Sequence, residues 1–373
     1  MIYLDYSANT PADPAVLQAF VQTEQNFIGN PNSTHPLGLA AKAEMARATE
    51  HIAALLGVQP NEIIYTSGAS ESNNLAIKGL ASANRHHGRH IISTGLEHSS
   101  AAGSLTALQE QGWEIDLVSI GRDGKIDLEE LRELLRPDTV LVALCAVDSE
   151  LGTVQPVAEV VEILKDYPNC RLHIDATQAV GKTALTWQGV DTMSIAPHKF
   201  YGLNGSGILL KRSGVALTPQ IHGGASTTLY RSGTPALALA VSTETALSLA
   251  LENQPARMQK VQALNARLRK ALSAYPKVRI NSPADAVPHI LNLSVQGVKG
   301  TRFQQALGEN GVCVSVKSAC SSDGTPSRAV FAVSRDRKTA LSSWRISLSH
   351  LTSEEELTGF LQIFDRLYHE LEK

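Results

Sequence analysis

Apolar and polar residues alternate over the first 210 residues in the rhythm of strands separated by helices. Apolar residues recur at helical spacing over residues 37–56, and Gly57 is a suitable helix end. Residues 140–147 form a nearly continuous apolar run, which is typical of a strand buried on both faces of a parallel sheet. The same reasoning predicts strands beginning near residues 62, 90, 113 and 171, and helices over residues 15–27, 97–111, 127–135 and 156–166. We therefore expect an α/β fold with a mostly parallel central sheet and flanking helices.

The last third of the chain has a different pattern. Pro255 interrupts a helical region over residues 236–274. Beyond it the pattern predicts strands over residues 289–295, 312–316 and 343–350, a helix over residues 301–309, and a capping box that starts at Ser353. Because strands and helices mix here without a parallel rhythm, we expect a smaller α+β domain. We assign residues 15–255 to the large α/β domain, and residues 1–14 and 256–373 to the small one.

The composition is that of a globular protein and argues against several functions. With 33 Lys and Arg against 36 Asp and Glu, the net charge of −3 indicates neither direct nucleic-acid binding nor an anionic-membrane surface. The N-terminus has no secretory signal pattern, and no apolar run approaches the roughly 18 residues of a membrane span. Four scattered cysteines without a C-x-x-C pair favour neither a disulfide framework nor a zinc site. We expect a cytoplasmic protein without a metal site or membrane contact.

Seven polar side chains follow the ends of predicted strands. They are Ser70, His98, Ser149, Asp175, Gln178, His198 and Lys199. Ligands bind at this edge of open α/β sheets. Lys199 is the most informative because it lies in a Gly-rich turn after an apolar run, where a desolvated amine can form a Schiff base. A lone loop lysine is more simply a solvent-exposed side chain, so this interpretation depends on its neighbours.

A carboxylate and a phosphate-binding turn accompany Lys199. Asp175 ends a predicted strand 24 residues earlier. Pyridoxal phosphate (PLP) requires a lysine for its aldehyde and a carboxylate for its ring nitrogen. The turn Gly68-Ala69-Ser70 opens a predicted helix whose N–H groups would favour a phosphate, although Ser70 could be a simple helix N-cap. Neither a dinucleotide fingerprint nor a P-loop is present, so the set favours pyridoxal phosphate.

Ten short stretches, spread over nearly the whole chain, form a specific set. They are Tyr3-Leu-Asp-Tyr6, Gly29-Asn-Pro31, Thr66-Ser-Gly-Ala-Ser-Glu-Ser-Asn-Asn74, Glu97-His98, Glu150-Leu-Gly-Thr153, His173-Ile-Asp-Ala-Thr-Gln178, His198-Lys-Phe-Tyr-Gly202, Arg231-Ser-Gly-Thr234, Ser318-Ala-Cys320 and Arg345-Ile-Ser-Leu348. As a set they resemble the group I cysteine desulfurases, the NifS/IscS-like members of the class V, fold-type I aminotransferase superfamily. The resemblance implies a fold-type I transferase fold, pyridoxal 5'-phosphate as cofactor, L-cysteine as substrate and a homodimer.

The resemblance implies roles around the cofactor ring. Lys199 would hold the cofactor aldehyde as a Schiff base and then carry protons. His98 would stack on the pyridine ring and assist proton transfer, Asp175 would pair with the ring nitrogen, and Gln178 would hydrogen-bond the phenolate oxygen. The alternative for His98 is a surface histidine at a helix N-terminus.

The resemblance also implies how the cofactor phosphate is held. Ala69 and Ser70 would contribute the turn, His198 would add its side chain, and Thr234 would come from a partner subunit. The phosphate-binding serine that the family usually has three residues before the lysine is Ala196 in this chain, so one hydroxyl donor is missing.

Three further residues are expected at the substrate. Arg345 would clamp the substrate carboxylate through a bidentate pair, its alternative being a surface ion pair. Ser149 replaces the asparagine that usually contacts the cofactor phenolate and the substrate carboxylate. Asn32 belongs to a turn, residues 29–35, which is dense in hydrogen-bonding groups and is either a substrate-facing loop or a simple connection. We assign Asn32, with Ser149, to substrate binding.

Cys320 would attack the substrate sulfur, form a persulfide and release alanine. A thiol reacts as the thiolate, which a polar loop with Lys317 nearby favours. The family usually has a glycine where Lys317 stands. Cys145 and Cys313 lie in apolar strands and are expected to be structural.

The main hypothesis is a PLP-dependent L-cysteine desulfurase that passes sulfur to acceptor proteins for iron–sulfur clusters or thiolated tRNA. The alternatives are a related class V activity (selenocysteine lyase, cystine lyase or aminotransferase) and a scaffold that has lost its chemistry. A thiol at Cys320 has no use in an aminotransferase, and the retention of Lys199, Asp175, His98 and Arg345 argues against a scaffold.

Overall fold

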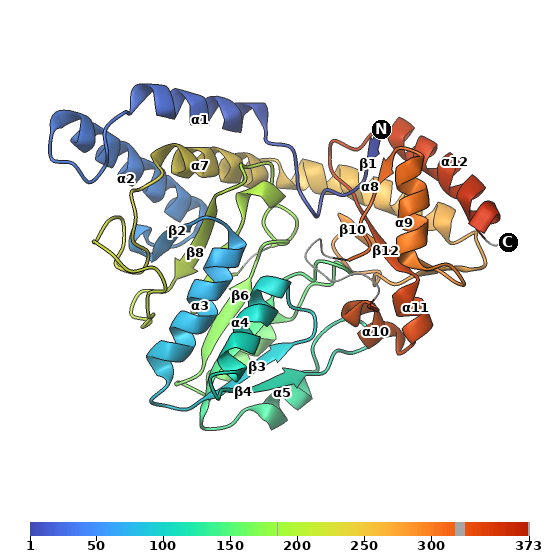
Figure 1. Ribbon diagram of the computed structural model, residues 1–373, viewed down its shortest axis with the longest axis horizontal. Coiled ribbons are helices and arrows are strands. Elements are labelled where there is room, and N and C mark those ends of the chain that lie inside the picture. Colours follow the sequence, from blue (N-terminus) through green and yellow to red (C-terminus); the bar gives the residue numbers. More distant parts are fainter. Residues whose placement is uncertain (185, 318–324, 372–373) are drawn as a thin grey trace.

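A seven-stranded sheet forms the centre of the protein (Figure 1). The computed structural model describes residues 1–184, 186–317 and 325–371. In the order in which they neighbour each other, the strands are β2 (Ile63–Thr66), β8 (Gly207–Lys211), β7 (Thr192–Ile195), β6 (Arg171–Asp175), β5 (Thr139–Cys145), β3 (His90–Thr94) and β4 (Glu114–Val118). The five strands from β7 to β4 pair in parallel, and β8 runs antiparallel to β2 and β7. The predicted mostly parallel sheet is therefore confirmed, whereas β8 was not expected.

Helices cover both faces of this sheet. The first seven are α1 (Pro14–Asn26), α2 (Pro36–Leu56), α3 (Ala69–Asn84), α4 (Ser99–Gln109), α5 (Leu128–Leu134), α6 (Val157–Leu164) and α7 (Leu237–Glu252). Successive side chains of β5 point to opposite faces. Leu141 and Ala143 pack with α3 and α4, whereas Val142 and Leu144 pack with α5 and α6. All seven residues of β5 are buried, as its continuous apolar run predicted.

A smaller unit lies to the right of the large sheet in Figure 1, and both chain termini lie in it. Its strands are β9 (Val278–Ile280), β10 (Ile290–Val295) and β12 (Ser343–Ser347) in an antiparallel sheet, with β1 (Ile2–Tyr3) and β11 (Val312–Cys313) as a separate pair. Its helices are α8 (Gln254–Leu272), α9 (Gly300–Glu309), α10 (Arg328–Ser334), α11 (Arg337–Leu341) and α12 (Glu354–Leu371). The Trp344 ring stacks on Phe303 with centroids 5.3 Å apart. The mixture of elements that the sequence predicted is present.

Several boundaries differ from the prediction for local reasons. Pro255 lies in the first turn of α8, where its missing N–H costs no hydrogen bond, so it starts a new helix and does not kink an existing one. The strand expected over residues 312–316 is only two residues long. The capping box at Ser353 is present: the Ser353 N–H donates to Glu356, and the Glu356 N–H donates back to the Ser353 hydroxyl.

Hydrophobic clusters cover both faces of the large sheet, and a separate cluster fills the smaller unit. Leu4 packs in the smaller core with residues from 261 to 368. Ala329, Val330 and Ala340 pack instead against the core of the large sheet. The domain bounds at residues 14 and 255 stay a prediction. Among the residues that the structure describes, no helix is long and apolar enough to cross a membrane, and no group of three metal-ligating side chains is present.

Candidate active site

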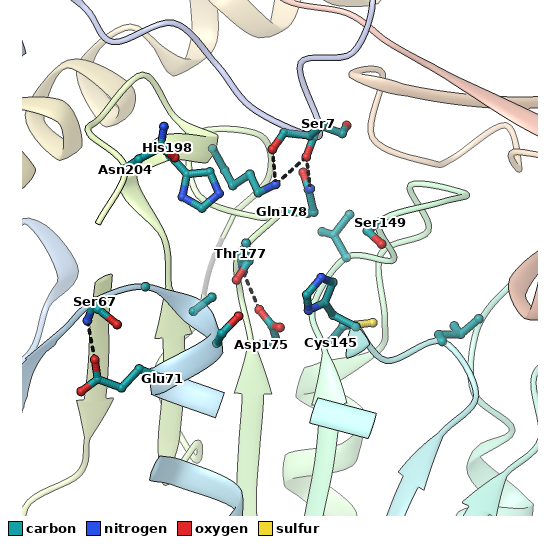
Figure 2. A pocket seen from close by; sticks show the side chains of 18 of the residues that line it. Ser7, Ser67, Glu71, Cys145, Ser149, Asp175, Thr177, Gln178, His198 and Asn204 are labelled. Carbon is teal, nitrogen blue, oxygen red and sulfur yellow. Dashed lines mark hydrogen bonds between the residues drawn. The ribbon is translucent and has the colours of Figure 1, made fainter. Parts of the chain in front are cut away.

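A cavity of about 350 Å³ opens at the carboxyl ends of the parallel strands (Figure 2). The residues around it come from the N-terminal segment, from the loops after five strands of the large sheet, and from β12. They are Ser7, Ala8, Ser67, Gly68, Ala69, Ser70, Glu71, Leu96, His98, Cys145, Val147, Ser149, Asp175, Thr177, Gln178, His198, Lys199, Asn204, Gly205 and Arg345. Because parallel strands end at the same edge, side chains that are far apart in the sequence meet here.

Lys199 ends a short 3₁₀ turn, Pro197–Lys199, that directly follows β7. The chain then turns sharply: Tyr201 has a φ of 69°, and a Cβ on Gly202 would lie 2.4 Å from the Pro197 side chain. The Lys199 amine donates to the carbonyls of Ser7 at 2.8 Å and Ala8 at 2.7 Å. These contacts hold the amine at the cavity wall, so the interpretation of Lys199 as a solvent-exposed loop lysine is wrong.

The Asp175 carboxylate is held at the end of β6 by N–H donors. Its Oδ2 accepts from the Asn73 amide at 2.7 Å. Its Oδ1 accepts from the Thr177 backbone N–H at 2.9 Å (Figure 2). The Asn73 Oδ1 in turn contacts His173 Nε2 at 3.0 Å. Asp175 is only 6% exposed. The carboxylate therefore has a fixed orientation in a largely dehydrated site.

His98 is the N-cap of α4 and lines the cavity, where it is half-buried, so it is not a surface histidine; its stacking on the cofactor ring stays a prediction. Its Nδ1 accepts from the Ser100 backbone N–H at 3.2 Å, which places the proton of the neutral ring on Nε2. Burial lowers the pKa of His98, assisted by the charge of Lys199 and opposed by Asp175. Burial likewise lowers the pKa of His198 to about 4, with Lys199 and Lys182 contributing. Both imidazoles are therefore neutral at neutral pH.

The N-terminus of α3 faces the cavity without a side-chain cap. Gly68 is the N-cap residue, with a φ of 151°, and no side chain accepts from the first turn. Ser70 lies inside the helix, so its alternative role as N-cap is wrong. A Cβ on Gly207 would lie 2.6 Å from the Gly68 Cα, which shows how closely β8 packs under this turn. Uncapped N–H groups at a helix N-terminus are a ready anion site.

Arg345 is buried on β12, with an exposed fraction of 2%, so it is not a surface ion pair. Its Nη1 donates to the Ser149 carbonyl at 2.6 Å, and its Nη2 pairs with Asp5 at 3.1 Å. The other Asp5 oxygen accepts from the Ser315 hydroxyl at 2.8 Å. A guanidinium has five N–H donors, and these two contacts orient it toward the cavity without using all of them.

Three carboxyl groups near Arg345 or Asp175 have raised pKa values. Burial raises the pKa of Glu97 to about 8 and the pKa of Asp148 to about 7. Burial also raises the pKa of Glu150, which accepts from the Ser327 hydroxyl at 2.5 Å. A raised pKa favours the neutral carboxyl form, so each of these groups carries less than a full negative charge near Arg345 and Asp175.

The cysteines differ in position. Cys145 is buried as expected, but it also forms part of the cavity wall, and burial raises its thiol pKa well above the usual range, so it is not a thiolate. Cys313 lies half-buried in β11. Cys320 lies outside the described residues. The residues on either side of 318–324 contact each other: the Lys317 amine donates to the carbonyl and hydroxyl of Thr325 at 3.0 and 2.8 Å.

Most of the residues that the sequence singled out meet at this cavity, and two do not. The nine that line it are Ala69, Ser70, His98, Ser149, Asp175, Gln178, His198, Lys199 and Arg345. Asn32 is exposed and contacts Ser226 beside a different cavity, and Thr234 is exposed in the loop before α7. Sequence reasoning missed Ser7, Thr177 and Asn204; the last has a signal, the Gly-rich turn after Lys199.

The donor set of the cavity fits pyridoxal phosphate. The uncapped N-terminus of α3 suits a phosphate, and the Asp175 carboxylate suits a protonated ring nitrogen. Two cavity hydroxyls, those of Ser7 and Thr177, are buried without a hydrogen-bond partner among the described residues, which indicates space for a polar ligand. Ala196 is buried and offers no hydroxyl, so a bound phosphate would have one donor fewer and would rely more on the helix N-terminus.

Comparison with known proteins gives one consistent result. The family described as Aminotransferase class-V matches residues 2–360. The NifS/IcsS protein homolog of Lactobacillus delbrueckii subsp. bulgaricus is 36% identical, over all of this chain and 98% of that protein. The cysteine desulfurase IscS of Azotobacter vinelandii is 37% identical, over 95% of this chain and 90% of that protein. A solved NifS-like protein superposes with a TM-score of 0.92 at 33% identity, covering 99% of both chains.

A second solved structure is described as SspA in complex with cysteine. It has a TM-score of 0.82 at 30% identity and covers 95% of this chain and 100% of that one. The family match, the end-to-end relatives and the geometry around Lys199 and Asp175 all agree. The chain belongs to the class V aminotransferase family, and within it to the NifS/IscS-like enzymes that depend on pyridoxal phosphate.

Proposed function

We propose that the protein is an L-cysteine desulfurase, which converts L-cysteine to L-alanine and leaves the sulfur as a persulfide on Cys320. The observation that carries this proposal is the position of the buried Arg345 guanidinium at the same cavity as the Lys199 amine and the Asp175 carboxylate. The cavity thus offers a cation for the carboxylate of an amino acid beside the groups that pyridoxal phosphate needs. Curated relatives named cysteine desulfurase support this choice.

Bound pyridoxal phosphate supplies an electron sink for the charge that develops at the substrate Cα. The residues of this chain would do the rest. Asp175, held by Asn73 and Thr177, would keep the ring nitrogen protonated. Lys199 would take the Cα proton and return one, since its amine lies at the cavity wall. His98, neutral and protonated at Nε2, would pack on the ring and assist the transfer.

Arg345 would bind the substrate carboxylate. Asp5 and the Ser149 carbonyl fix the plane of the guanidinium, so part of the ordering cost is already met before the substrate arrives. Ser149 lines the cavity beside it, and its short hydroxyl replaces the longer amide that relatives would place there. We assign substrate binding to Arg345 and Ser149.

Sulfur transfer would take place on Cys320. Its thiolate attacks the substrate Sγ, an S–S bond forms, and the Cβ–Sγ bond breaks with its electron pair remaining on the substrate carbon. A proton then completes the methyl group of alanine, and no external oxidant is needed. In the step that follows, the outer sulfur is transferred to an acceptor protein for iron–sulfur clusters or tRNA thiolation. We place the enzyme in the cytoplasm.

The proposal predicts the products and a dependence on the substrate carboxylate. With pyridoxal phosphate and a thiol reductant, the purified protein should form alanine and sulfide from L-cysteine in equal amounts. Cysteamine, which lacks the carboxylate but keeps the amine and thiol, should react about 10- to 100-fold more slowly, because charge-assisted pairs with Arg345 contribute roughly 1.5–3 kcal/mol. Alanine by amino-acid analysis and sulfide by colorimetry give the result. Pyruvate or a mercapto keto acid in place of alanine would identify a lyase or an aminotransferase instead.

We also propose a homodimer. Seven of the eleven exposed large hydrophobic side chains in the described residues lie on α1, on α2, or in loops beside them. They are Leu17, Val21, Ile28, Leu37, Leu39, Ile221 and Leu229. Apolar patches of this kind mark protein interfaces. A second copy on this face would cover Asn32 and bring Thr234 toward a partner's cavity, where neither residue contributes within one chain.

Sedimentation velocity tests the dimer directly. The native protein should sediment at twice its 40.0 kDa chain mass. Leu39→Glu, which would bury a charge in the interface, should shift the population toward monomer, whereas Leu351→Glu, an equally exposed leucine near α12, should not. A native protein that sediments as a monomer at micromolar concentration would contradict the proposal.

A further inference from the structure

Lys182 is a buried lysine beside the cavity to which the chemistry above assigns no role. It lies in the turn after β6, is only 8% exposed, and its amine donates to the Gln178 Oε1 at 2.6 Å. Burial, assisted by the charges of Lys199 and Arg345, lowers the pKa of Lys182 to about 7. No carboxylate is among the groups that shift this pKa. An amine that is buried without a carboxylate partner costs stability, which indicates a purpose other than packing.

The contacts of Gln178 determine which way its amide points. Its Oε1 accepts from the Lys182 amine. Its Nε2 donates to the Ser7 carbonyl at 2.9 Å (Figure 2). The Ser7 carbonyl can only accept, so the flipped amide would set one carbonyl oxygen against another. Gln178 is 5% exposed and lines the cavity, and the structure assigns its second Nε2 hydrogen no protein acceptor among the described residues.

The same carbonyl also links Gln178 to the reactive lysine. The Ser7 oxygen accepts from the Lys199 amine at 2.8 Å as well as from Gln178. Lys182, Gln178, Ser7 and Lys199 therefore form one continuous chain of hydrogen bonds along the cavity wall. A displacement of the Gln178 amide would therefore change the hydrogen bonding of Lys199, the residue that we propose holds the cofactor.

We propose that Lys182 is a positioning residue, which orients the Gln178 amide so that its remaining N–H points to the cofactor oxygen next to Lys199. The inference rests on the proposed function, since it takes the cavity to hold pyridoxal phosphate. A donor at that oxygen, like a nearby positive charge, favours the deprotonated form of the bound cofactor. Lys182 thereby acts through Gln178 on the pH at which the visible absorbance of the loaded protein changes.

Within the part of the chain that the structure describes, four charged or titratable groups interact electrostatically with Lys182. They are Lys199 after β7, Arg345 on β12, His198 beside Lys199, and His289 just before β10. Burial lowers the pKa of His289 to about 3 and that of His198 to about 4, so both rings stay neutral above pH 6. Changes in the absorbance between pH 6 and 10 therefore do not come from these histidines.

A double-mutant cycle tests the proposal. Four proteins loaded with pyridoxal phosphate are compared: the native chain, Lys182→Met, Gln178→Ala and the double variant. Lys182→Met should raise the pKa of the visible absorbance change by about 0.5 to 1 unit, the size expected for one lost hydrogen bond. In the Gln178→Ala background the same substitution should raise it by less than half as much, because the amide through which it acts is gone.

Two further variants separate positioning from folding. Lys182→Arg keeps a donor and a charge, so its pKa should stay within about 0.3 unit of the native value. Lys211→Met removes another buried lysine, which ends β8 and is 4% exposed, and whose amine donates to the carbonyls of Arg212 and Val215 in the turn that follows. This substitution should leave the absorbance pKa unchanged. Thermal unfolding by circular dichroism checks that each variant is folded.

Each outcome has a distinct meaning. Equal shifts from Lys182→Met with and without Gln178 would show that Lys182 acts by its charge alone and would overturn the proposal. No shift in either background would overturn it too. If the native protein binds no pyridoxal phosphate and shows no visible band, the proposed function fails; if it has the band and forms alanine but the cycle is additive, only the role of Lys182 fails.

Discussion

Cys320→Ala should abolish the turnover of L-cysteine while leaving the visible absorbance of the bound cofactor intact. The thiol is the proposed acceptor of the substrate sulfur, and no second thiol is placed to replace it. Cys145 lines the cavity, but burial keeps its pKa well above the usual range, so it is a poor nucleophile. Loss of a covalent nucleophile lowers the rate on the order of 10³-fold or more. Alanine formation under excess thiol reductant measures the effect.

Cys313→Ala is the matched control for this substitution. Cys313 pairs with Tyr3 across β1 and β11, seven residues before Cys320, and has no place in the cavity. Its replacement should leave alanine formation within about twofold of the native rate. Mass spectrometry after cysteine addition, without reductant, should find one extra sulfur in the native protein and in Cys313→Ala only. If Cys320→Ala still forms alanine at the native rate, the persulfide does not form on this residue.

Lys199→Ala should remove both the covalent attachment of the cofactor and the proton transfer at the substrate. The Lys199 amine lies against the Ser7 and Ala8 carbonyls at the cavity wall, and removing a positioned proton carrier lowers rates by roughly 10²–10⁴-fold. Borohydride reduction of the loaded native protein should fix the cofactor to the peptide that contains Lys199. Tryptic mass spectrometry should find no such label in the variant, and alanine formation should fall accordingly.

The second cavity-side amine makes this test specific. Lys182 also has an amine near the cavity, and its pKa is lowered to about 7, so it is the one competitor for the aldehyde that the described residues offer. Lys182→Met should keep the borohydride label on the Lys199 peptide. A label on the peptide that contains Lys182, in the native protein, would show that the reactive lysine was assigned wrongly.

The sequence was sufficient for the architecture, and it singled out side chains that the structure brings together at one cavity. Strand and helix periodicity predicted the parallel sheet, since each strand has to bury two faces, and it placed Lys199, Asp175 and His98 after strand ends. Those ends lie at one edge by the geometry of parallel strands, so the three side chains meet there. The antiparallel strand β8 was not predicted, because its five residues directly follow a Gly-rich turn whose sequence is typical of a loop.

The contacts that hold these groups could not be predicted from local sequence patterns. Nothing near Asp175 indicates that Asn73, on a helix about a hundred residues earlier, supplies one of its hydrogen bonds. Similarly, the Ser7 carbonyl reaches Lys199 across 192 positions of sequence. Such partners depend on how helices and the N-terminal segment pack on the sheet, and packing depends on the whole chain at once.

The sequence by itself therefore determined the fold class, the family and its cofactor, because side-chain type and strand periodicity are local properties; the chemistry of Lys199 stays a prediction. Only the tertiary structure decided which amide faces Asp175, that Asp5 orients Arg345, that the first turn of α3 is uncapped, and that Lys182 is buried against Gln178. The contacts of Asn73 with Asp175 and of Asp5 with Arg345 join distant segments, whereas Lys182 and Gln178 are only four residues apart and are buried together by the rest of the fold. Asn32 and Thr234 lie outside the cavity of one chain, and their placement awaits the partner subunit that we propose.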